Sequence, residues 1–404
     1  MSLHVSVVIP VLNQWRLTER CLRTLAEHSP GDIRVVVVDN ASSDETGNSC
    51  PALGKALFGP RFTFLRQEAN LNFGPASNLG ASHVRDGVLV FLNNDTEVRP
   101  GWLPPLIAAL DNPKIGAAGP RLLYPDGRVQ HVGTAFTPQL GPTHIFEHFP
   151  GDHPAALARR RCQAITAAAL CIRADFFREL DGFYPEFRNG SEDLDLCARI
   201  RARGLQLAVC PESAVIHHTS QSAGRFDHDG ANAALLRSRQ AQAFAPDLHL
   251  FARQAGYRLR LTPWLTPFMA PPEQIFRAEN QMDLGELRKA LLKEPLWEDG
   301  YCQLANAALD AGDHALALEG LFLCSQFFPS VENYRRLQRT AAGMGAATLA
   351  GDVAQKIRII EAILADRPKL ARTAQTLAAR FKAAGQPELH ALYRDWLAEF
   401  AHAT

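Results

Sequence analysis

The sequence lacks the features of a membrane-spanning, disulfide-bonded or nucleic-acid-binding protein. No apolar run approaches the length that spans a bilayer, and residues 1–13 lack the basic start and cleavage site of a secretory leader. Lys plus Arg and Asp plus Glu both total 42, so no excess charge predicts a nucleic acid or an anionic membrane as partner. The eight cysteines form no CxxC pair, which is typical of buried thiols in a reducing compartment. We therefore expect a cytoplasmic protein.

What is present is an ordinary globular composition in which strand and helix patterns alternate. The 404 residues are 47% hydrophobic, enough for two or three domains. Short runs rich in β-branched residues predict buried strands, and apolar residues at helical spacing predict helices between them. The expected strands cover residues 5–9, 35–38, 62–65, 88–92 and 115–118, and the expected helices 17–25, 74–83 and 102–110. This alternation predicts an α/β fold, with a mixed, mainly parallel sheet covered by helices.

Polar side chains follow two of these strands at the point where each strand ends. Asn93, Asn94 and Asp95 come directly after the strand at 88–92, and Asp39 follows the strand at 35–38. In an open α/β sheet, ligands bind at the carboxyl ends of the strands. Asp95 is an oxygen ligand of the kind that Mg²⁺ and Mn²⁺ prefer. The alternative is turn chemistry, in which these side chains bond to the local backbone or Asp39 caps the next helix.

The pattern becomes irregular over residues 119–161, which predicts a functional or mobile loop. Residues 190–193 then introduce a helix with acidic residues in its first turn, where Glu192, Asp193 and Asp195 could simply complement the helix dipole. Two short strands are expected at 207–210 and 214–216, the second ending at His217 and His218, and a closing helix at 232–244.

Strand patterns disappear in the last part of the chain. We expect three regions: an α/β domain over residues 1–245, a proline-rich linker or strap over 246–272, and an all-α domain over 273–404. Pro295 and Pro329 lie 34 residues apart, and large and small residues between them match the spacing of a tetratricopeptide repeat. Helix pairs of that kind present a concave surface to a protein or peptide, whereas a plain helical bundle is the alternative.

Four blocks of the first 225 residues together resemble the family 2 glycosyltransferases of the GT-A fold. The blocks are, in order, residues 7–13 (VVIPVLN), 38–44 (VDNASSD), 92–96 (LNNDT) and 191–196 (SEDLDL). The turn at 70–78 and the late His217-His218 with Ser222 are also similar to that family. The resemblance implies an inverting transferase that moves a sugar from a nucleotide-diphosphate donor to an acceptor hydroxyl.

The resemblance also implies roles for individual residues. Asp193 would be the general base that takes the proton of the acceptor hydroxyl. Asp95 and His217 (or its neighbour His218) would hold Mn²⁺ or Mg²⁺, which neutralises the leaving diphosphate. The expected nucleotide-sugar-binding residues are Pro10, Val11, Asn13, Asp39, Asn72, Asn78, Asn94, Asp95 and Glu192. The chain departs from the family pattern at Asn93, where an aspartate often stands, and at residues 166–169 (TAAA), where Thr-Gly-Ala is common.

The acceptor is less specified than the donor. The helical domain suggests a protein acceptor docked on it, such as flagellin or another surface protein. One alternative is a transferase that builds a cell-surface polysaccharide or a lipid-linked glycan. An alternative of another class is a non-catalytic nucleotide-binding scaffold, favoured by the departures at Asn93 and residues 166–169. No nucleic acid and no transmembrane segment is expected.

Overall fold

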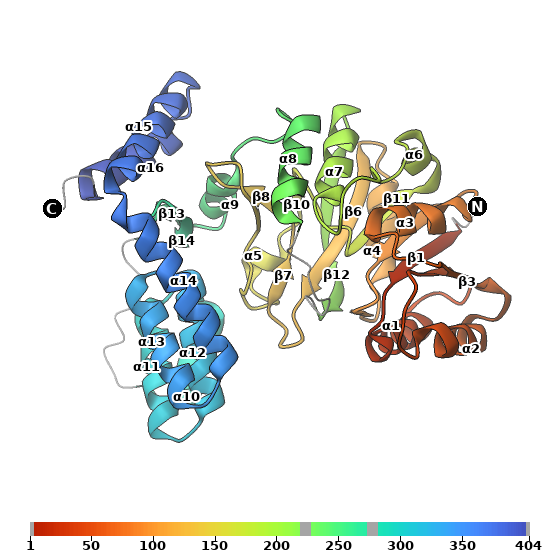
Figure 1. Cartoon of the computed structure of the whole chain (residues 1–404), viewed down its shortest axis with the longest axis horizontal. Coiled ribbons are helices and arrows are strands. Elements are labelled where there is room, and N and C mark those ends of the chain that lie inside the picture. Colours follow the sequence, from red (N-terminus) through yellow and green to blue (C-terminus); the bar gives the residue numbers. More distant parts are fainter. Residues whose placement is uncertain (1–3, 219–227, 273–281, 401–404) are drawn as a thin grey trace. The chain divides into compact units, whose positions relative to one another are not determined.

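The computed structural model describes residues 4–218, 228–272 and 282–400, and Ser222 lies outside the described residues. The chain divides into two compact units. The first unit comprises residues 1–136 and 142–245, and the second comprises residues 137–141 and 246–404. In Figure 1 the first unit runs from red to green and the second is mostly blue.

The first unit is built on one mixed sheet whose strand order is β10-β12-β6-β11-β4-β1-β2-β3. Two further short strands pair at its side, β5 with β12 and β7 with β6. The strands are β1 (Val5–Val11), β2 (Arg34–Asp39), β3 (Phe62–Arg66), β4 (Val88–Leu92), β5 (Thr96–Val98), β6 (Ile115–Leu123), β7 (Val129–His131), β10 (Arg160–Cys162), β11 (Ala169–Arg173) and β12 (Gln206–His217). A separate hairpin joins β8 (Thr134–Phe136) to β9 (Pro142–His144).

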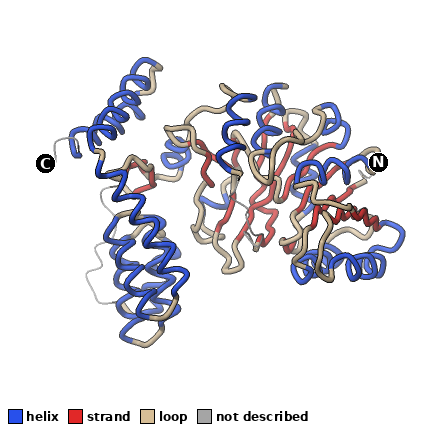
Figure 2. Tube along the Cα trace, in the orientation of Figure 1, coloured by secondary structure: helices blue, strands red, loops and turns tan. Residues whose placement is uncertain are grey.

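Helices cover both faces of this sheet, as the blue coils around the red strands show in Figure 2. They are α1 (Trp15–His28), α2 (Thr46–Phe58), α3 (Phe73–Ser82), α4 (Leu103–Leu110), α5 (Pro154–Leu157), α6 (Ala174–Glu179), α7 (Glu192–Ala202) and α8 (Asp229–Arg239). The predicted α/β class, with a mixed, mainly parallel sheet covered by helices, is confirmed.

The central strands are buried on both faces because alternate side chains point to opposite sides of a strand. On one side, Val7 and Ile9 of β1 share a core cluster with Leu22 of α1. On the other side, Phe91 of β4 packs against the ring of Phe177, with 4.7 Å between ring centroids. The continuous apolar runs in the sequence are the consequence of this two-sided burial.

The direction of the strands brings their polar carboxyl ends to the same end of the sheet. β4, β1, β2 and β3 are mutually parallel, and β12 is parallel to β6. β11 lies between β4 and β6 and is antiparallel to both, so β4, β6 and β12 run the same way. Their carboxyl ends therefore lie on one side of the sheet, where ligands bind in open α/β folds.

Some local predictions for the first unit were wrong. The two short strands expected at 207–210 and 214–216 are one strand, β12, with an irregular register between Cys210 and Ala214. Pro211 follows Cys210 and has no N–H to donate to the ladder, so the chain departs from regular pairing there. The helix expected at 232–244 is α8 and ends at Arg239. The irregular stretch 119–161 contains the end of β6, strands β7 to β10 and α5.

The described residues of the second unit form helices and one hairpin. Its helices are α9 (Leu248–Gln254), α10 (Leu284–Lys293), α11 (Glu298–Asp310), α12 (His314–Phe327), α13 (Val331–Gly343), α14 (Ala347–Ala365), α15 (Arg367–Ala383) and α16 (Pro387–Phe400). Side chains cap several helices, as Asp283 and Glu286 do for α10 in a reciprocal capping box. The expected helical region is confirmed, whereas the hairpin of β13 (Arg258–Leu261) and β14 (Pro267–Ala270) was not predicted.

Within the described ranges, no helix has both the length and the apolar character that crossing a membrane requires.

Candidate functional site

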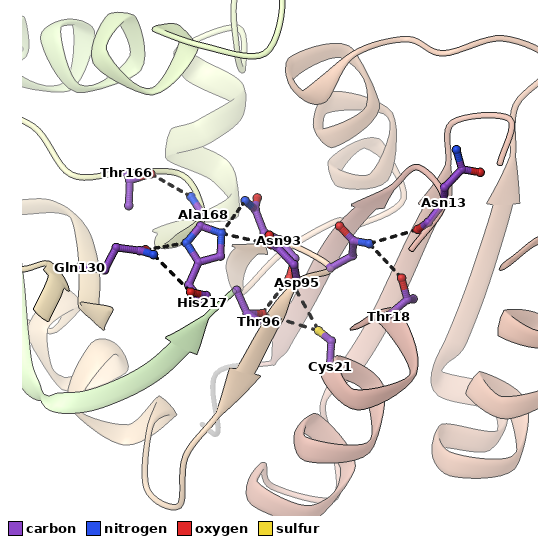
Figure 3. Close-up of polar contacts among 11 residues, drawn as sticks. Asn13, Thr18, Cys21, Asn93, Asp95, Thr96, Gln130, Thr166, Ala168 and His217 are labelled. Atoms are coloured by element: carbon purple, nitrogen blue, oxygen red, sulfur yellow. Dashed lines mark hydrogen bonds and ion pairs between the residues drawn. The ribbon is translucent and has the colours of Figure 1, made fainter. Parts of the chain in front are cut away.

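The turn after β4 is held in place by contacts to three other segments. The Asn93 N–H donates to the carbonyl of Ala168 at 2.9 Å, and the Thr96 hydroxyl donates to the carbonyl of Asn93 at 2.7 Å. The Asn94 amide donates to the Thr18 hydroxyl of α1 at 2.9 Å. Figure 3 shows these contacts around the end of the strand. The turn that carries Asp95 therefore has a defined conformation.

His217 reaches Asp95 because β12 pairs with β5. In this antiparallel pair His217 lies opposite Thr96, the residue after Asp95. The His217 Nε2 atom is 3.1 Å from Asp95 Oδ1 and 3.3 Å from the amide nitrogen of Asn93. Both side chains are mostly buried, with 9% of His217 and 13% of Asp95 exposed. Two residues 122 positions apart in the chain thus face each other at the rim of the sheet.

His218 has a different partner. Its Nε2 atom lies 2.7 Å from Glu97 Oε1, and its backbone N–H donates to the carbonyl of Asp95. Of the two neighbouring histidines, only His217 directs a ring nitrogen to the Asp95 carboxylate among the contacts that the structure gives. The sequence left open which of the two histidines would bind the metal, and this geometry favours His217.

The ring of His217 is also contacted by Gln130 of β7, a residue that sequence reasoning missed. Gln130 Oε1 lies 2.6 Å from His217 Nδ1, and the Gln130 amide donates to the His217 carbonyl at 3.2 Å. Gln130 lies in the irregular region 119–161, where no pattern in the sequence distinguishes it from its neighbours. Only the pairing of β7 with β6 brings it beside the end of β12.

Asp193 lies in the first turn of α7 and is half-buried. Its Oδ1 atom accepts from the N–H of Leu194 at 2.8 Å, and its Oδ2 atom accepts from the N–H of Ala167 at 3.4 Å. The adjacent Ala168 carbonyl accepts from Asn93, as described above. The segment 166–168 thus links Asp193 to the turn of Asp95, and the two acids share one neighbourhood.

The other two acids in the first turn of α7, Glu192 and Asp195, accept hydrogen bonds from nearby groups. Glu192 accepts from the N–H of Gly190 at 2.6 Å. Asp195 is fully buried and accepts from Arg199, Arg239 and Gln240. Although its burial opposes ionisation, the hydrogen bonds from Arg239 and Gln240 and the charge of Arg199 hold the pKa of Asp195 below its usual range. Asp193 is therefore the acid of this turn that hydrogen bonds connect, through residues 167–168, to the turn of Asp95.

The predicted base-binding residues Asp39 and Asn13, at the ends of β2 and β1, both bond to the loop at residues 42–43. Asp39 is fully buried, with Oδ1 accepting from the N–H of Ser42 at 2.9 Å and Oδ2 from Arg66 at 2.8 Å. Asn13 Oδ1 accepts from the N–H of Ser43 at 2.8 Å. Asp39 does not cap α2, whose N-cap is Glu45. Arg66, at the end of β3, is a further residue that sequence reasoning missed.

The remaining predicted residues differ in their surroundings. Pro10 and Val11 are buried in β1, so their side chains belong to the core. Asn72 precedes α3 with a positive φ of 65° and no side-chain cap. Asn78 accepts from the N–H of Phe183 at 2.8 Å and donates to its carbonyl at 2.7 Å, which ties α3 to the loop after α6. The structure does not bring Asn78 together with the Asp95 cluster by any contact it gives.

The pair of Asp95 and His217 fits a divalent cation that also takes ligands from a substrate. Among residues 4–218, 228–272 and 282–400, no group of three or more His, Cys, Asp or Glu side chains is arranged to hold a metal. Mg²⁺ commonly binds one or two carboxylates together with water and substrate phosphates. Adjacent ligands of an octahedral ion with bonds of about 2.1 Å lie about 3.0 Å apart, close to the observed 3.1 Å.

Comparison with known proteins finds a family model and relatives that match the first unit. Residues 6–157 match the family model described as glycosyl transferase family 2. The chain is 29% identical over 276 residues to the O-antigen biosynthesis protein RfbC of Myxococcus xanthus, covering 65% of this chain and 19% of that protein. It is 27% identical over 256 residues to N-acetylglucosaminyl-diphospho-decaprenol L-rhamnosyltransferase of Mycobacterium tuberculosis, covering 57% of this chain and 80% of that protein.

A solved structure with a similar chain trace is the crystal structure of GalNAc-T7 with UDP, GalNAc and Mn²⁺. The TM-score is 0.47 at 18% identity, over 63% of this chain and 54% of that chain. The chain spans about a fifth of the length of the Myxococcus relative.

The first unit is thus an α/β domain with a mixed sheet, and the match of residues 6–157 agrees with the resemblance of its motifs to family 2 glycosyltransferases. The match to glycosyl transferase family 2 lies within this unit, at residues 6–157.

Proposed function

We propose that this protein is an inverting, metal-dependent glycosyltransferase that moves a sugar from a nucleotide-diphosphate donor to an acceptor hydroxyl. The observation that carries the proposal is the contact of His217 with Asp95, in a turn that residues 167–168 connect by hydrogen bonds to Asp193. A carboxylate, an imidazole nitrogen and a second carboxylate are the groups that such a transfer requires.

Asp95 and His217 would hold the Mn²⁺ or Mg²⁺ ion. A divalent cation, when bound, neutralises charge that develops on the diphosphate as the glycosidic bond breaks. The geometric support is the separation of 3.1 Å between Asp95 Oδ1 and His217 Nε2. Asn93 adds an amide where an aspartate would add a second charge, so the protein supplies few negative charges to the ion. The donor diphosphate would complete the set of ligands.

Asp193 would act as the general base. The base must accept a proton from the acceptor hydroxyl while the oxygen attacks the anomeric carbon opposite the departing diphosphate. Its position in the first turn of α7 favours the ionised carboxylate, because the positive end of the helix dipole lies there. The Ala167 N–H orients the carboxylate at 3.4 Å.

Asp39 and Asn13 would shape the nucleotide-base pocket through the loop that they hold together. Both side chains bond to the segment 42–43, which ties the loop after β1 to the loop after β2. We further propose that Asn72, Asn94 and Glu192 lie along the donor site, and that Pro10 and Val11 support it from the core.

The test is release of nucleoside diphosphate from a panel of nucleotide sugars in the presence of Mn²⁺. We expect turnover of at least one donor by the wild type and a large loss in Asp193→Asn. Binding of a nucleoside diphosphate with Mn²⁺, measured by calorimetry, separates the enzyme from a scaffold that need not bind either. If no donor turns over and Asp193→Asn behaves like the wild type, the enzymatic proposal is wrong.

We propose that the acceptor is a protein that binds to the second unit. The helices of this unit pack in consecutive pairs, α11 with α12, α13 with α14 and α15 with α16, an architecture that often presents a surface to peptides. The unit also contains a cavity of about 980 Å³, whose lining includes Tyr257, Arg258, Trp297 and Phe328. Aromatic and arginine side chains are enriched in protein interfaces.

A second candidate acceptor is a lipid-linked or growing glycan. The names of the Myxococcus and Mycobacterium relatives, which refer to O-antigen and to a diphospho-decaprenol substrate, favour it. Incubation of the enzyme and a labelled donor with fractionated cell extract distinguishes the two. Label in trypsin-sensitive material supports the protein acceptor, and label in the organic extract supports the lipid-linked one.

A further inference from the structure

Gln130 makes two contacts with the same residue, and both are buried. Its side-chain Nε2 atom donates to the backbone carbonyl of His217 at 3.2 Å, while its Oε1 atom lies 2.6 Å from the ring Nδ1 of His217. Counted over the whole residue, backbone included, only 2% of Gln130 and 7% of His217 is exposed. Figure 3 shows the glutamine on one side of the imidazole and Asn93 and Asp95 on the other.

These two contacts determine which ring nitrogen carries the proton. The carbonyl of His217 can only accept, so the amide NH₂ group of Gln130 must face it. The amide oxygen of Gln130 then faces Nδ1, and because this oxygen can only accept, Nδ1 must carry a hydrogen. In the neutral imidazole the other nitrogen, Nε2, then keeps a lone pair that accepts from the Asn93 amide at 3.3 Å, and Asp95 Oδ1 lies 3.1 Å from the same nitrogen.

We propose that Gln130 is a positioning residue that holds His217 in the Nδ1–H tautomer, so that Nε2 is ready to bind the divalent cation beside Asp95. The proposal rests on the proposed function, since the cation belongs to it. A hydrogen bond to the non-ligating nitrogen is how metal-binding histidines are commonly oriented, and its partner is usually a carboxylate, a carbonyl or water. Here the partner is a neutral side-chain amide, which adds no negative charge to the site.

The position of Gln130 is itself fixed by the backbone on both sides. β7 pairs with β6 through Leu122 and Leu123. On its other side the N–H of Val129 donates to Phe149 at 2.7 Å, and the N–H of His148 donates to Val129 at 2.7 Å. Residues 148–149 therefore hold β7, the strand that carries Gln130, by backbone hydrogen bonds.

A purely structural role would also explain a glutamine that ties β7 to the end of β12, so the test must report on the imidazole. The variant Gln130→Met keeps the length of the side chain and removes both hydrogen bonds. The matched control is Gln163→Met, because Gln163 forms the same kind of two-bond clamp with the backbone of Ala245, at 2.6 and 2.9 Å. The glutamine of the control makes no contact with Asp95 or His217 among the contacts given.

We expect Gln130→Met to bind Mn²⁺ about 10–100-fold more weakly than the wild type, and Gln163→Met to bind it as the wild type does. Electron spin-echo spectroscopy of bound Mn²⁺ should show coordination by an imidazole nitrogen in the wild type and the control. That signature should be reduced in Gln130→Met. Equal affinity and an equal nitrogen signature in Gln130→Met would overturn the proposal.

A second measurement needs no variant at position 130 and therefore does not depend on its folding. Long-range ¹H–¹⁵N spectra of the metal-free protein, at a pH where imidazoles are neutral, report the tautomer of each histidine. His217 is assigned by the loss of its signals in His217→Gln. We expect Nδ1 protonated and Nε2 unprotonated, whereas an Nε2–H tautomer refutes the role of Gln130. Failure of the wild type to bind Mn²⁺ refutes the proposed metal site instead, so the two failures are distinguishable.

Discussion

Asp39 and Asp95 follow strands on either side of β1, yet the structure uses them differently. Asp39 is fully buried, and its two oxygens accept hydrogen bonds from Ser42 and Arg66. Asp95 retains some exposure and faces the imidazole nitrogen of His217. The first carboxylate organises a loop, and the second faces an imidazole beside the carboxyl ends of the strands. The two acids have similar sequence contexts, and their different neighbours in space give them different roles.

The same contrast recurs on α7 and among the histidines. Asp195 is bonded to three side chains, while Asp193, two residues earlier, is held mainly by backbone N–H groups. His131 is buried, and its ring nitrogens lie 3.3 Å from the hydroxyl of Thr134 and 3.4 Å from the N–H of Gly133. His217 directs one nitrogen to Asp95 instead. In each pair, the hydrogen-bond partners distinguish the residue that supports the fold from the residue that we propose for catalysis or metal binding.

The largest expected effect concerns Asp193. Asp193→Asn should lower the rate of sugar transfer by about 10²–10⁴-fold, because the contribution of a positioned base is lost. The free energy of unfolding should change by less than about 1 kcal/mol, since the amide oxygen can still accept from the helix backbone. Steady-state assays and urea unfolding measure the two quantities. A rate near that of the wild type would contradict the role of the base.

Asp195 should show the opposite pattern. Asp195→Ala leaves Arg199 and Arg239 without a buried partner, and we expect a loss of about 3 kcal/mol in the free energy of unfolding. Asp193→Ala is the matched control and should lose far less. Both are compared by urea unfolding monitored by circular dichroism. Equal stabilities of the two variants would contradict the claim that Asp195 supports the fold more than Asp193 does.

The buried His131 should make stability depend on pH. Burial, together with the nearby His144, His217 and Arg160, lowers the pKa of His131 well below 6.5. Below pH 6.5 the unfolded chain therefore takes up a proton that the folded chain does not, and stability falls as the pH falls. One proton accounts for at most about 1.4 kcal/mol per pH unit.

His131→Asn should reduce this slope, and the exposed His314 gives the control His314→Asn. Urea unfolding between about pH 7.5 and about pH 5 measures the slope of the free energy of unfolding against pH. An unchanged slope in His131→Asn would mean that this imidazole does not contribute.

The smallest expected effect is a gain. Asn93→Asp adds a carboxylate next to His217 Nε2, where the Asn93 amide now lies at 3.3 Å. Since affinity for hard cations rises with the number of charged ligands, Mn²⁺ binding should tighten by about threefold to tenfold. Isothermal titration calorimetry measures the change. Weaker binding would place the ion elsewhere than beside Asn93.

The elements that the sequence predicted best were those with the simplest patterns. Continuous apolar runs identified β1, β2 and β4, because both faces of these strands are covered. β12 was divided in two because Pro211 interrupts its pattern, although pairing with β6 resumes beyond the irregularity. The hairpin β13–β14 lies in a proline-rich stretch, where a strand pattern is weak.

The candidate site was predictable only in part. Asp95, Asp193 and His217 were named from ordered motifs, and the structure places Asp95 and His217 in contact. Gln130 and Arg66 were missed because each acts across the fold, Gln130 on a residue 87 positions away and Arg66 on one 27 positions away. Local patterns do not report such pairs. His217 and His218 could not be distinguished in the sequence because adjacent residues differ only in where the strand directs them.

The most direct test of the account is a crystal of the protein grown with Mn²⁺ and a nucleoside diphosphate, with anomalous scattering recorded at the manganese edge. The account predicts one peak within coordination distance of both Asp95 Oδ1 and His217 Nε2, with the diphosphate on the same ion. A peak bound by other side chains, or a bound nucleotide with no ion at Asp95, would contradict it.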